Sequence, residues 1–255
     1  MKCKICGTNN SSCFKGTILN KYEIKYYQCS KCDFVQTENP YWLDEAYSSP
    51  ITSSDTGYIS RNIFYSKRVS ILLFLLFGNK PKVLDFAGGY GVFVRLMRDI
   101  GFNFYWDDKY TPNLFSKGHE WDKKSRFDAI TLFEVFEHFI NPIDEIEGLL
   151  KTSKTLIFST TLYPKPLPSP QNWWYFGLEH GQHTSLYSKK TFYIISENYN
   201  LNYYNIGDLH ILTNKRISSI KLFLIKLDKL GFHKLIFRLL KSKTWLDHES
   251  VKEKP

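Results

Sequence analysis

The chain has 255 residues, of which 43% are hydrophobic and 17% are aromatic, so it can bury a core and is not a disordered polymer. Its net charge of +9 is uneven, because 11 Lys/Arg against four Asp/Glu lie from Lys215 to the end. The nearly neutral remainder argues against a nucleic-acid-binding body, and no apolar run reaches the roughly 20 residues of a membrane-spanning helix.

The first stretch, MKCKICGTNN, is polar and lacks the apolar core of a secretory signal, so we expect a cytoplasmic protein. Four of the five cysteines form two Cys-x2-Cys pairs, which are Cys3, Cys6, Cys29 and Cys32. Two such turns can supply four thiolates to one tetrahedral zinc ion, and four sulfurs leave no open position for catalysis. We therefore predict a structural zinc ribbon over residues 1–38, with Cys13 outside the ligand set.

Residues 16–29 alternate as the strands of a hairpin do, and residues 39–81 are expected to form a connecting segment followed by a helix over 59–78. From residue 82 onward, strands and helices alternate. We expect strands in KVLDFAG, FNFYWDD, FDAITLFEV and KTLIFSTTL, and helices in YGVFVRLMRDIG and PIDEIEGLLK. This alternation predicts an α/β fold with a doubly wound, mostly parallel sheet over residues 82–213.

The stretch VLDFAGGYG, residues 83–91, places glycines where the first strand meets its helix. Glycine accepts a positive φ there and lets a ligand approach the backbone. A dinucleotide fingerprint would need another glycine at Val94, which counts against NAD or FAD. Asp85 ends the strand, where it can face a cationic ligand. Asp107 and Asp108 end the next strand, where an acid can bind the two hydroxyls of a ribose.

The stretch VLDFAGGYG resembles the first motif, D-x-G-x-G-x-G, of the class I S-adenosylmethionine-dependent methyltransferases, with Ala87 replacing the first glycine. FDAITLFEVFEHFINP, residues 127–142, is similar to the fourth-strand motif of one subgroup. The resemblance covers roughly residues 58–200 and implies a Rossmann-like fold that binds S-adenosylmethionine. It implies that Asp108 holds the ribose, or Asp107 if the strand ends one residue earlier. The other cofactor-binding residues that it implies are Asp85, Ala87, Gly88, Gly89, Gly91, Glu134, Tyr58 and Arg61.

A pair of Cys-x2-Cys turns ahead of such a domain is similar to the arrangement in methyltransferases that modify sugars and other small polar acceptors. An acceptor hydroxyl must lose a proton, and NWWYFGLEHGQHTSLYS, residues 172–188, offers histidines for this. Its GQHTSLYS resembles a segment of sugar-modifying relatives and points to His183 as the base, with His180 and His138 as rivals. Aromatic and amide groups suit a sugar, so we expect Trp173, Trp174, Tyr175 and Gln182 to contact the acceptor.

A second mechanism follows from the E-x-x-E-H pattern of some relatives, in which Glu134, Glu137 and His138 would bind Mg²⁺ beside the acceptor. We favour the metal-free base. Residues 214–255 form a basic amphipathic tail, expected to be a helix pair broken at Gly231 that packs on the domain. Contact of this tail with a membrane surface, or with an anionic ligand, is the alternative.

The expected protein is thus an O-methyltransferase for a sugar or a nucleotide-activated sugar in surface-polysaccharide or related biosynthesis. Two alternatives remain. One is an RNA methyltransferase that uses the ribbon to bind nucleic acid, and the other is a scaffold that keeps the cofactor fold without catalysis.

Overall fold

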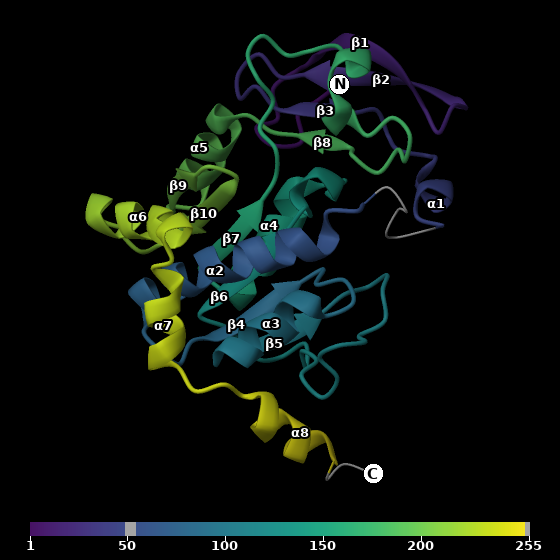
Figure 1. Ribbon diagram of the computed structural model, residues 1–255. Helices are drawn as coiled ribbons and strands as arrows, with labels where there is room; N and C mark the ends of the chain where they lie inside the picture. Colours follow the sequence, from purple (N-terminus) through teal and green to yellow (C-terminus); the bar gives the residue numbers. More distant parts are fainter. Residues whose placement is uncertain (49–54, 253–255) are drawn as a thin grey trace. The chain divides into compact units, whose positions relative to one another are not determined.

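The computed structural model describes residues 1–48 and 55–252 (Figure 1). They form two compact units. Unit 1 comprises Met1–Thr52, Phe133–Lys151 and Phe158–Asn214, and unit 2 comprises Ser53–Leu132, Thr152–Ile157 and Lys215–Pro255. The units differ from the four consecutive ranges expected from the sequence, because the chain passes from one to the other inside two strands. Residues 49–54 of the expected connecting segment lie outside the described residues.

Unit 1 contains a four-stranded antiparallel sheet with the order β1-β2-β3-β8. Its strands are β1 (Ser11–Ile18), β2 (Tyr22–Gln28), β3 (Val35–Thr37) and β8 (Ser185–Leu186). The expected hairpin is present, and it turns at Leu19 and Asn20, whose positive φ values of 52° and 53° suit a tight reversal between twisted strands. The fourth strand of this sheet, β8, pairs with β3. It comes from residues 82–213, the range expected for the methyltransferase domain.

The rest of unit 1 contains helices and an antiparallel strand pair. The helices are η1 (Phe136–His138), α4 (Pro142–Thr152), η2 (Pro170–Asn172), η3 (Trp174–Phe176) and α5 (Lys189–Asn198), and the strands are β9 (Asn202–Ile206) and β10 (Leu209–Thr213). Ser188 begins α5 with a capping box, in which its hydroxyl accepts from the Thr191 amide at 3.1 Å. A short α1 (Leu43–Ala46) packs beside the small sheet, where Trp42 donates to the Gly181 carbonyl at 2.8 Å.

Unit 2 contains the strands β4 (Lys82–Phe86) and β5 (Asn103–Asp107) and the helices α2 (Tyr58–Phe77) and α3 (Val92–Ile100). β4 pairs in parallel with β5 and with β6 (Ala129–Phe133). α2 packs against α3 and confirms the expected helix over 59–78 within one residue at each end. Gly78 ends α2 with a φ of 77°, a conformation that glycine adopts without a steric penalty.

Together with β7 (Thr155–Ser159), these strands form a six-stranded mixed sheet with the order β5-β4-β6-β7-β10-β9. Every strand expected between residues 82 and 162 is present, within three residues at each end. The order and the helices that flank the sheet confirm the expected Rossmann-like α/β class. The antiparallel edge formed by β9 and β10 was not predicted, although the two residues between these strands, Gly207 and Asp208, are a typical hairpin turn.

The basic tail is helical and belongs to unit 2. It contains α6 (Ser219–Lys226), η4 (Leu227–Leu230), α7 (His233–Leu239) and α8 (Thr244–Lys252), with the expected break at Gly231. Two buried ion pairs attach it: Arg68 on α2 binds Asp228 at 3.2 Å, and Arg98 on α3 binds Asp247 at 2.6 Å.

The tail also leaves large apolar side chains exposed, on which the membrane-contact alternative depends. These are Ile220, Phe223, Leu230, Leu235, Leu239, Trp245 and Leu246. Within the described part of the chain, none of the helices has the length and apolar content to cross a bilayer.

Candidate functional site

The turn between β4 and α3 in unit 2 is shaped for close approach to its backbone. Gly89 and Gly91 have positive φ values of 56° and 86°. A Cβ at Gly89 would lie 2.6 Å from the Tyr58 hydroxyl, and one at Gly91 would lie 2.5 Å from Ser116 Oγ. Ala87 also has a positive φ of 54°, which costs an L-residue about 1–2 kcal/mol and explains why glycine is usual at this position of the motif.

Asp85 lies buried beneath this turn, with 3% of its surface exposed. Its Oδ1 accepts a hydrogen bond from the Thr131 hydroxyl at 2.6 Å. Among the described residues, no cation forms an ion pair with it. Burial raises its pKa from 3.8 to about 7, and the hydrogen bond from Thr131 opposes this rise. Asp85 can therefore exchange a proton near neutral pH, and a cationic ligand would favour its ionised form.

The Asp108 carboxylate binds the glycine turn, whereas Asp107 contacts it only through its backbone carbonyl, which accepts from the Gly88 amide at 3.1 Å. One Asp108 oxygen accepts from the Gly89 amide at 2.9 Å, and the other accepts from the Tyr110 and Thr111 amides at 2.7 and 2.8 Å. Asp107 instead forms an ion pair with Lys123. β5 ends at Asp107. The resemblance implied that Asp107 and not Asp108 would hold the ribose if the strand ended there. The side-chain geometry nevertheless keeps Asp108 as the candidate, because its carboxylate lies against the turn.

Tyr58 and Arg61 begin α2 in the same unit. The Tyr58 hydroxyl lies over Gly89, and burial raises its pKa to about 12. Arg61 forms a bidentate pair with Asp55, at 2.8 and 2.7 Å. Arg61 was expected to bind a carboxylate of the ligand, but in the structure it binds the carboxylate of Asp55. Of Tyr58 and Arg61, Tyr58 is the residue that contacts the turn.

Glu134, at the end of β6 in unit 1, has a positive φ of 54°, which is strained for a residue with a side chain. Its amide donates to Ser159 Oγ at 2.9 Å, and the Ser159 hydroxyl returns a short hydrogen bond to the Glu134 carboxylate. Strain of this kind persists only where the surrounding structure holds it, and it concentrates at functional positions. Glu134 stays a candidate for cofactor contact on that ground.

A second polar group in unit 1 brings together Glu137, His138 and His183, whose ligand-type atoms lie within 4.8 Å of one another. Nδ1 of His183 lies 2.7 Å from the Tyr175 carbonyl, which can only accept, so this nitrogen carries the proton and Nε2 carries the lone pair. Burial lowers the pKa of both imidazoles, so they are neutral at pH 7. Burial also raises the pKa of Glu137.

The residues expected to contact an acceptor have different environments. Tyr175 is 1% exposed, and its hydroxyl donates to Glu137 Oε1 at 2.6 Å, while the Gln182 amide donates to the Ala46 carbonyl at 2.7 Å. Both are packed into unit 1 instead of presenting free polar groups. Trp174 is 73% exposed, and Trp173 is partly buried against Tyr175. His180 Nδ1 accepts from the Gln182 amide at 3.1 Å, and burial lowers its pKa to about 4.

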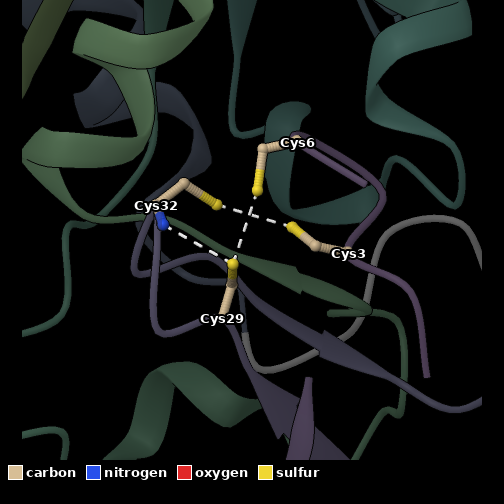
Figure 2. A group of neighbouring side chains, drawn as sticks. All are labelled: Cys3, Cys6, Cys29 and Cys32. Carbon is tan, nitrogen blue, oxygen red and sulfur yellow. Dashed lines mark hydrogen bonds between the residues drawn. The ribbon is translucent and has the colours of Figure 1, made fainter. Parts of the chain in front are cut away.

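The four paired cysteines converge from two similar turns of unit 1 (Figure 2). The amides of Gly7 and Asp33 each donate at 2.9 Å to the carbonyl of the first cysteine of their pair. Opposing sulfurs lie 3.4 Å apart between Cys3 and Cys32 and 3.5 Å apart between Cys6 and Cys29. Ligands about 2.3 Å from a tetrahedral zinc ion lie about 3.8 Å apart, so the spacing fits zinc and is far too long for a disulfide. Cys13 points instead to the Tyr26 carbonyl.

Sequence reasoning missed Thr131 and Trp106, which support these groups, and it gave Tyr175 a different role. Thr131 contacts Asp85, Trp106 donates to the Gly89 carbonyl at 2.8 Å, and Tyr175 holds Glu137. Thr131 had a signal, because parallel pairing of β4 and β6 sets it beside Asp85. Trp106 had none, and Tyr175 was predicted to contact an acceptor and not Glu137, since both roles depend on contacts between distant parts of the sequence.

Comparison with known proteins identifies the family of the chain and proteins of similar fold. A family model described as a methyltransferase domain matches residues 60–206. The fold is similar to that of the plantazolicin methyltransferase BpumL in complex with SAH, with a TM-score of 0.50 and 14% identity over 80% of this chain and 91% of that one. Magnesium protoporphyrin IX methyltransferase from Synechocystis PCC 6803, with bound SAH, gives a TM-score of 0.45 and 16% identity over 67% and 90% of the two chains. No curated protein matches the chain. Because the family model spans more than half of the sequence, the chain belongs to the methyltransferase-domain family and is an S-adenosylmethionine-dependent methyltransferase.

Proposed function

We propose that the protein methylates a hydroxyl group of a small polyhydroxylated acceptor, such as a sugar or a nucleotide-activated sugar. The observation that carries this proposal is the orientation of His183, whose Nδ1–H···O bond of 2.7 Å to Tyr175 leaves Nε2 with a lone pair. Neutral imidazole is the group that can assist removal of a hydroxyl proton near pH 7. Amine acceptors that are already deprotonated would not require it.

We also propose how unit 2 binds the cofactor. Asp108 would accept hydrogen bonds from the ribose hydroxyls, and ionised Asp85 would face the cationic methionine end. Gly89 and Gly91 have no side chain and would let the methionine part of the cofactor approach the backbone. S-adenosylmethionine supplies a methyl group on a sulfonium, a leaving group that needs no acid. The protein must hold the acceptor oxygen in line with that methyl group and remove its proton.

The hydroxyl proton leaves as the new carbon–oxygen bond forms, and the electrons of the broken carbon–sulfur bond return to sulfur. In this proposal His183 is required for activating the hydroxyl, and His180 is not. The Nε2 lone pair of His183 can serve in two ways: by taking the proton itself, or by binding a cation that makes the hydroxyl more acidic.

The four cysteines would hold a structural zinc ion in unit 1, since their sulfurs fit a tetrahedral site that leaves no position for substrate. Nucleic acid is not the acceptor in this proposal, because most of the excess of basic residues lies in the tail and the ribbon has no run of basic and aromatic residues beyond KYEIKYYQC.

The test incubates the full-length protein and S-adenosylmethionine with a panel of nucleotide-sugars, free glycosides and short RNAs, and follows the products by mass spectrometry. We expect the mass of one methyl group to be added to a sugar, at a site that tandem spectra assign to oxygen. His183→Ala should lower turnover by about 10²–10⁴ without changing cofactor affinity, while His180→Ala should retain most activity. Methylation of RNA alone, in a reaction that weakens steeply with salt, would contradict the proposal.

A further inference from the structure

The helices α6 and α7 of the basic tail are attached to unit 2 through an inner face that packs against α2 (Figure 1). On this face the side chains of Ile225 and Ile236 are buried, and Asp228 between them binds Arg68 at 3.2 Å. His233 Nδ1 donates a further hydrogen bond of 3.1 Å to the Asp228 carbonyl. Apolar burial and a buried ion pair thus already join the tail to unit 2, and the side chains on the outer face are not required for that attachment.

The outer face carries apolar and basic side chains together. Its large apolar side chains, each between 53% and 83% exposed, are Ile220, Phe223, Leu230, Leu235 and Leu239. Its exposed basic side chains are Lys226, Lys229, Lys234, Arg238 and Lys241. We call these two sets the tail patch. The other exposed residues between positions 218 and 242 are serines, and the acid in this range, Asp228, is buried. The tail patch therefore combines apolar surface with five positive charges and no exposed acid.

This combination indicates both the chemistry and the charge of a partner. Single exposed apolar side chains are ordinary in soluble proteins, whereas several on one surface, bordered by polar groups, mark an interaction site. Among the described residues, the five basic residues of the tail patch take no part in an ion pair, and the ion pairs of the tail use Asp228, Asp247 and Glu249. A fitting partner must therefore be apolar and carry negative charge.

We propose that the tail patch docks the protein on the surface of a membrane that contains anionic lipids. The apolar side chains would enter the boundary between headgroups and acyl chains, and the basic side chains would contact lipid phosphates. Lysine and arginine suit this boundary, because their stems can lie along an apolar surface while the charged ends stay in water. Docking would be peripheral, since no helix in the described part of the chain can cross a bilayer. This inference goes beyond the proposed function and does not depend on the acceptor.

Other partners match only one of the two properties of the tail patch. A second copy of the chain would bring two sets of like charges together, without an exposed acid in the patch to pair with them. RNA would attract the basic side chains, but its phosphate backbone offers no apolar surface to isoleucine and leucine. An anionic bilayer supplies negative charge and an apolar interior at the same place.

The test measures binding of the full-length protein to vesicles by sedimentation. One set of vesicles is phosphatidylcholine alone, and in the other about one third of the lipid is phosphatidylglycerol. We expect the anionic vesicles to bind the protein at least about tenfold more tightly. This binding should weaken when NaCl is raised from about 0.1 M to about 1 M, because the Debye length falls from about 10 Å to about 3 Å.

The apolar part of the tail patch is tested with one pair of variants. Leu239→Ser should weaken binding to anionic vesicles by about 3–30-fold, because it removes a side chain that would be buried in the bilayer. Leu246→Ser is the matched control: Leu246 is 63% exposed and Leu239 is 64% exposed, but Leu246 lies on α8, outside the tail patch. Leu246→Ser should bind vesicles as the parent does.

The basic part is tested with two charge reversals of equal size. Lys229→Glu combined with Lys234→Glu should lower affinity for anionic vesicles at least about tenfold. Lys151→Glu combined with Lys154→Glu changes the net charge equally at two exposed positions outside the tail, and it should have little effect. All the replaced side chains are exposed, so the variants should fold, and S-adenosylhomocysteine binding by calorimetry checks this.

Three results would overturn the proposal: no binding to anionic vesicles, equal binding to both kinds of vesicle, or equal losses in the tail-patch variants and their controls. It would also be overturned if the parent is a dimer without lipid and Leu239→Ser a monomer, or if the protein binds RNA in preference to vesicles. Every readout is a binding measurement that involves no methyl transfer. Failure of membrane docking is therefore distinguishable from failure of the proposed function.

Discussion

Cofactor affinity should depend on pH through one buried carboxyl group, that of Asp85. Its pKa is raised from 3.8 to about 7, chiefly by burial, and its hydrogen bond from Thr131 only partly offsets this. With that pKa, the ionised fraction is about one tenth at pH 6 and about nine tenths at pH 8. If the ionised form binds the cationic methionine end, affinity should fall about tenfold from pH 8 to pH 6, or about 1.4 kcal/mol.

The assay is isothermal titration calorimetry with S-adenosylhomocysteine, whose ammonium group stays protonated across this range. In buffers with different ionisation enthalpies, binding near pH 7 should release part of a proton. Asp85→Asn is the matched variant, because the side chain keeps an oxygen for Thr131 and cannot ionise. It should bind more weakly than the parent at pH 8, with an affinity that hardly changes with pH. An unchanged pH dependence in Asp85→Asn would refute the reasoning.

The same shift links Asp85 to the stability of the unliganded protein. A carboxyl whose pKa is higher in the folded chain binds its proton more tightly there than in the unfolded chain. Its contribution is fully present below about pH 4 and is lost as pH rises through about 7, at most about 4 kcal/mol for a shift of this size. The free energy of unfolding should therefore fall over this range in the parent, relative to Asp85→Asn.

Three further predictions concern single side chains. Metal analysis should find about one zinc per chain, and Cys29→Ser should lose most of it and unfold the small sheet first, whereas full zinc retention would argue against the cysteine site. In calorimetry, Asp108→Ala should weaken S-adenosylhomocysteine binding by about 2–4 kcal/mol, and Asp107→Ala by much less. The reverse order would show that Asp107 binds the ribose hydroxyls. Gly91→Ala should lower stability by about 1–3 kcal/mol because its φ is 86°, while Gly148→Ala, in α4 with nothing within 4 Å of an added Cβ, should raise the melting temperature.

Local sequence signals were sufficient for much of this molecule. The glycine turn after KVLDF, the end of α2 at Gly78 and the two cysteine pairs are encoded in short stretches. These features were predictable because few residue types fit them: glycine is favoured where φ is positive, and a zinc site needs cysteines at a fixed spacing. The sequence could not decide between Asp107 and Asp108, because β5 ends at Asp107 whereas the carboxylate that accepts from the Gly89 amide is that of Asp108.

The remaining features depend on packing between distant stretches. Tyr175 and Gln182 resemble ligand-binding residues in the sequence, yet their polar atoms satisfy Glu137 and the Ala46 carbonyl. A tyrosine hydroxyl or an amide needs a partner wherever it is buried, and residue type does not say whether that partner is the chain or a ligand. Pairing of β8 with β3 was unpredictable for a similar reason, because a two-residue strand has no periodicity.

The proposed reaction is transfer of a methyl group from S-adenosylmethionine to a sugar-like hydroxyl. Its most direct measurement is mass spectrometry of the acceptor panel with isotopically labelled S-adenosylmethionine, comparing the parent with Asp108→Ala. We expect the labelled methyl group to appear on an oxygen of a sugar acceptor with the parent protein, and far more slowly with the variant. Binding of S-adenosylhomocysteine without labelled product on any sugar, or equal product from both proteins, would contradict it.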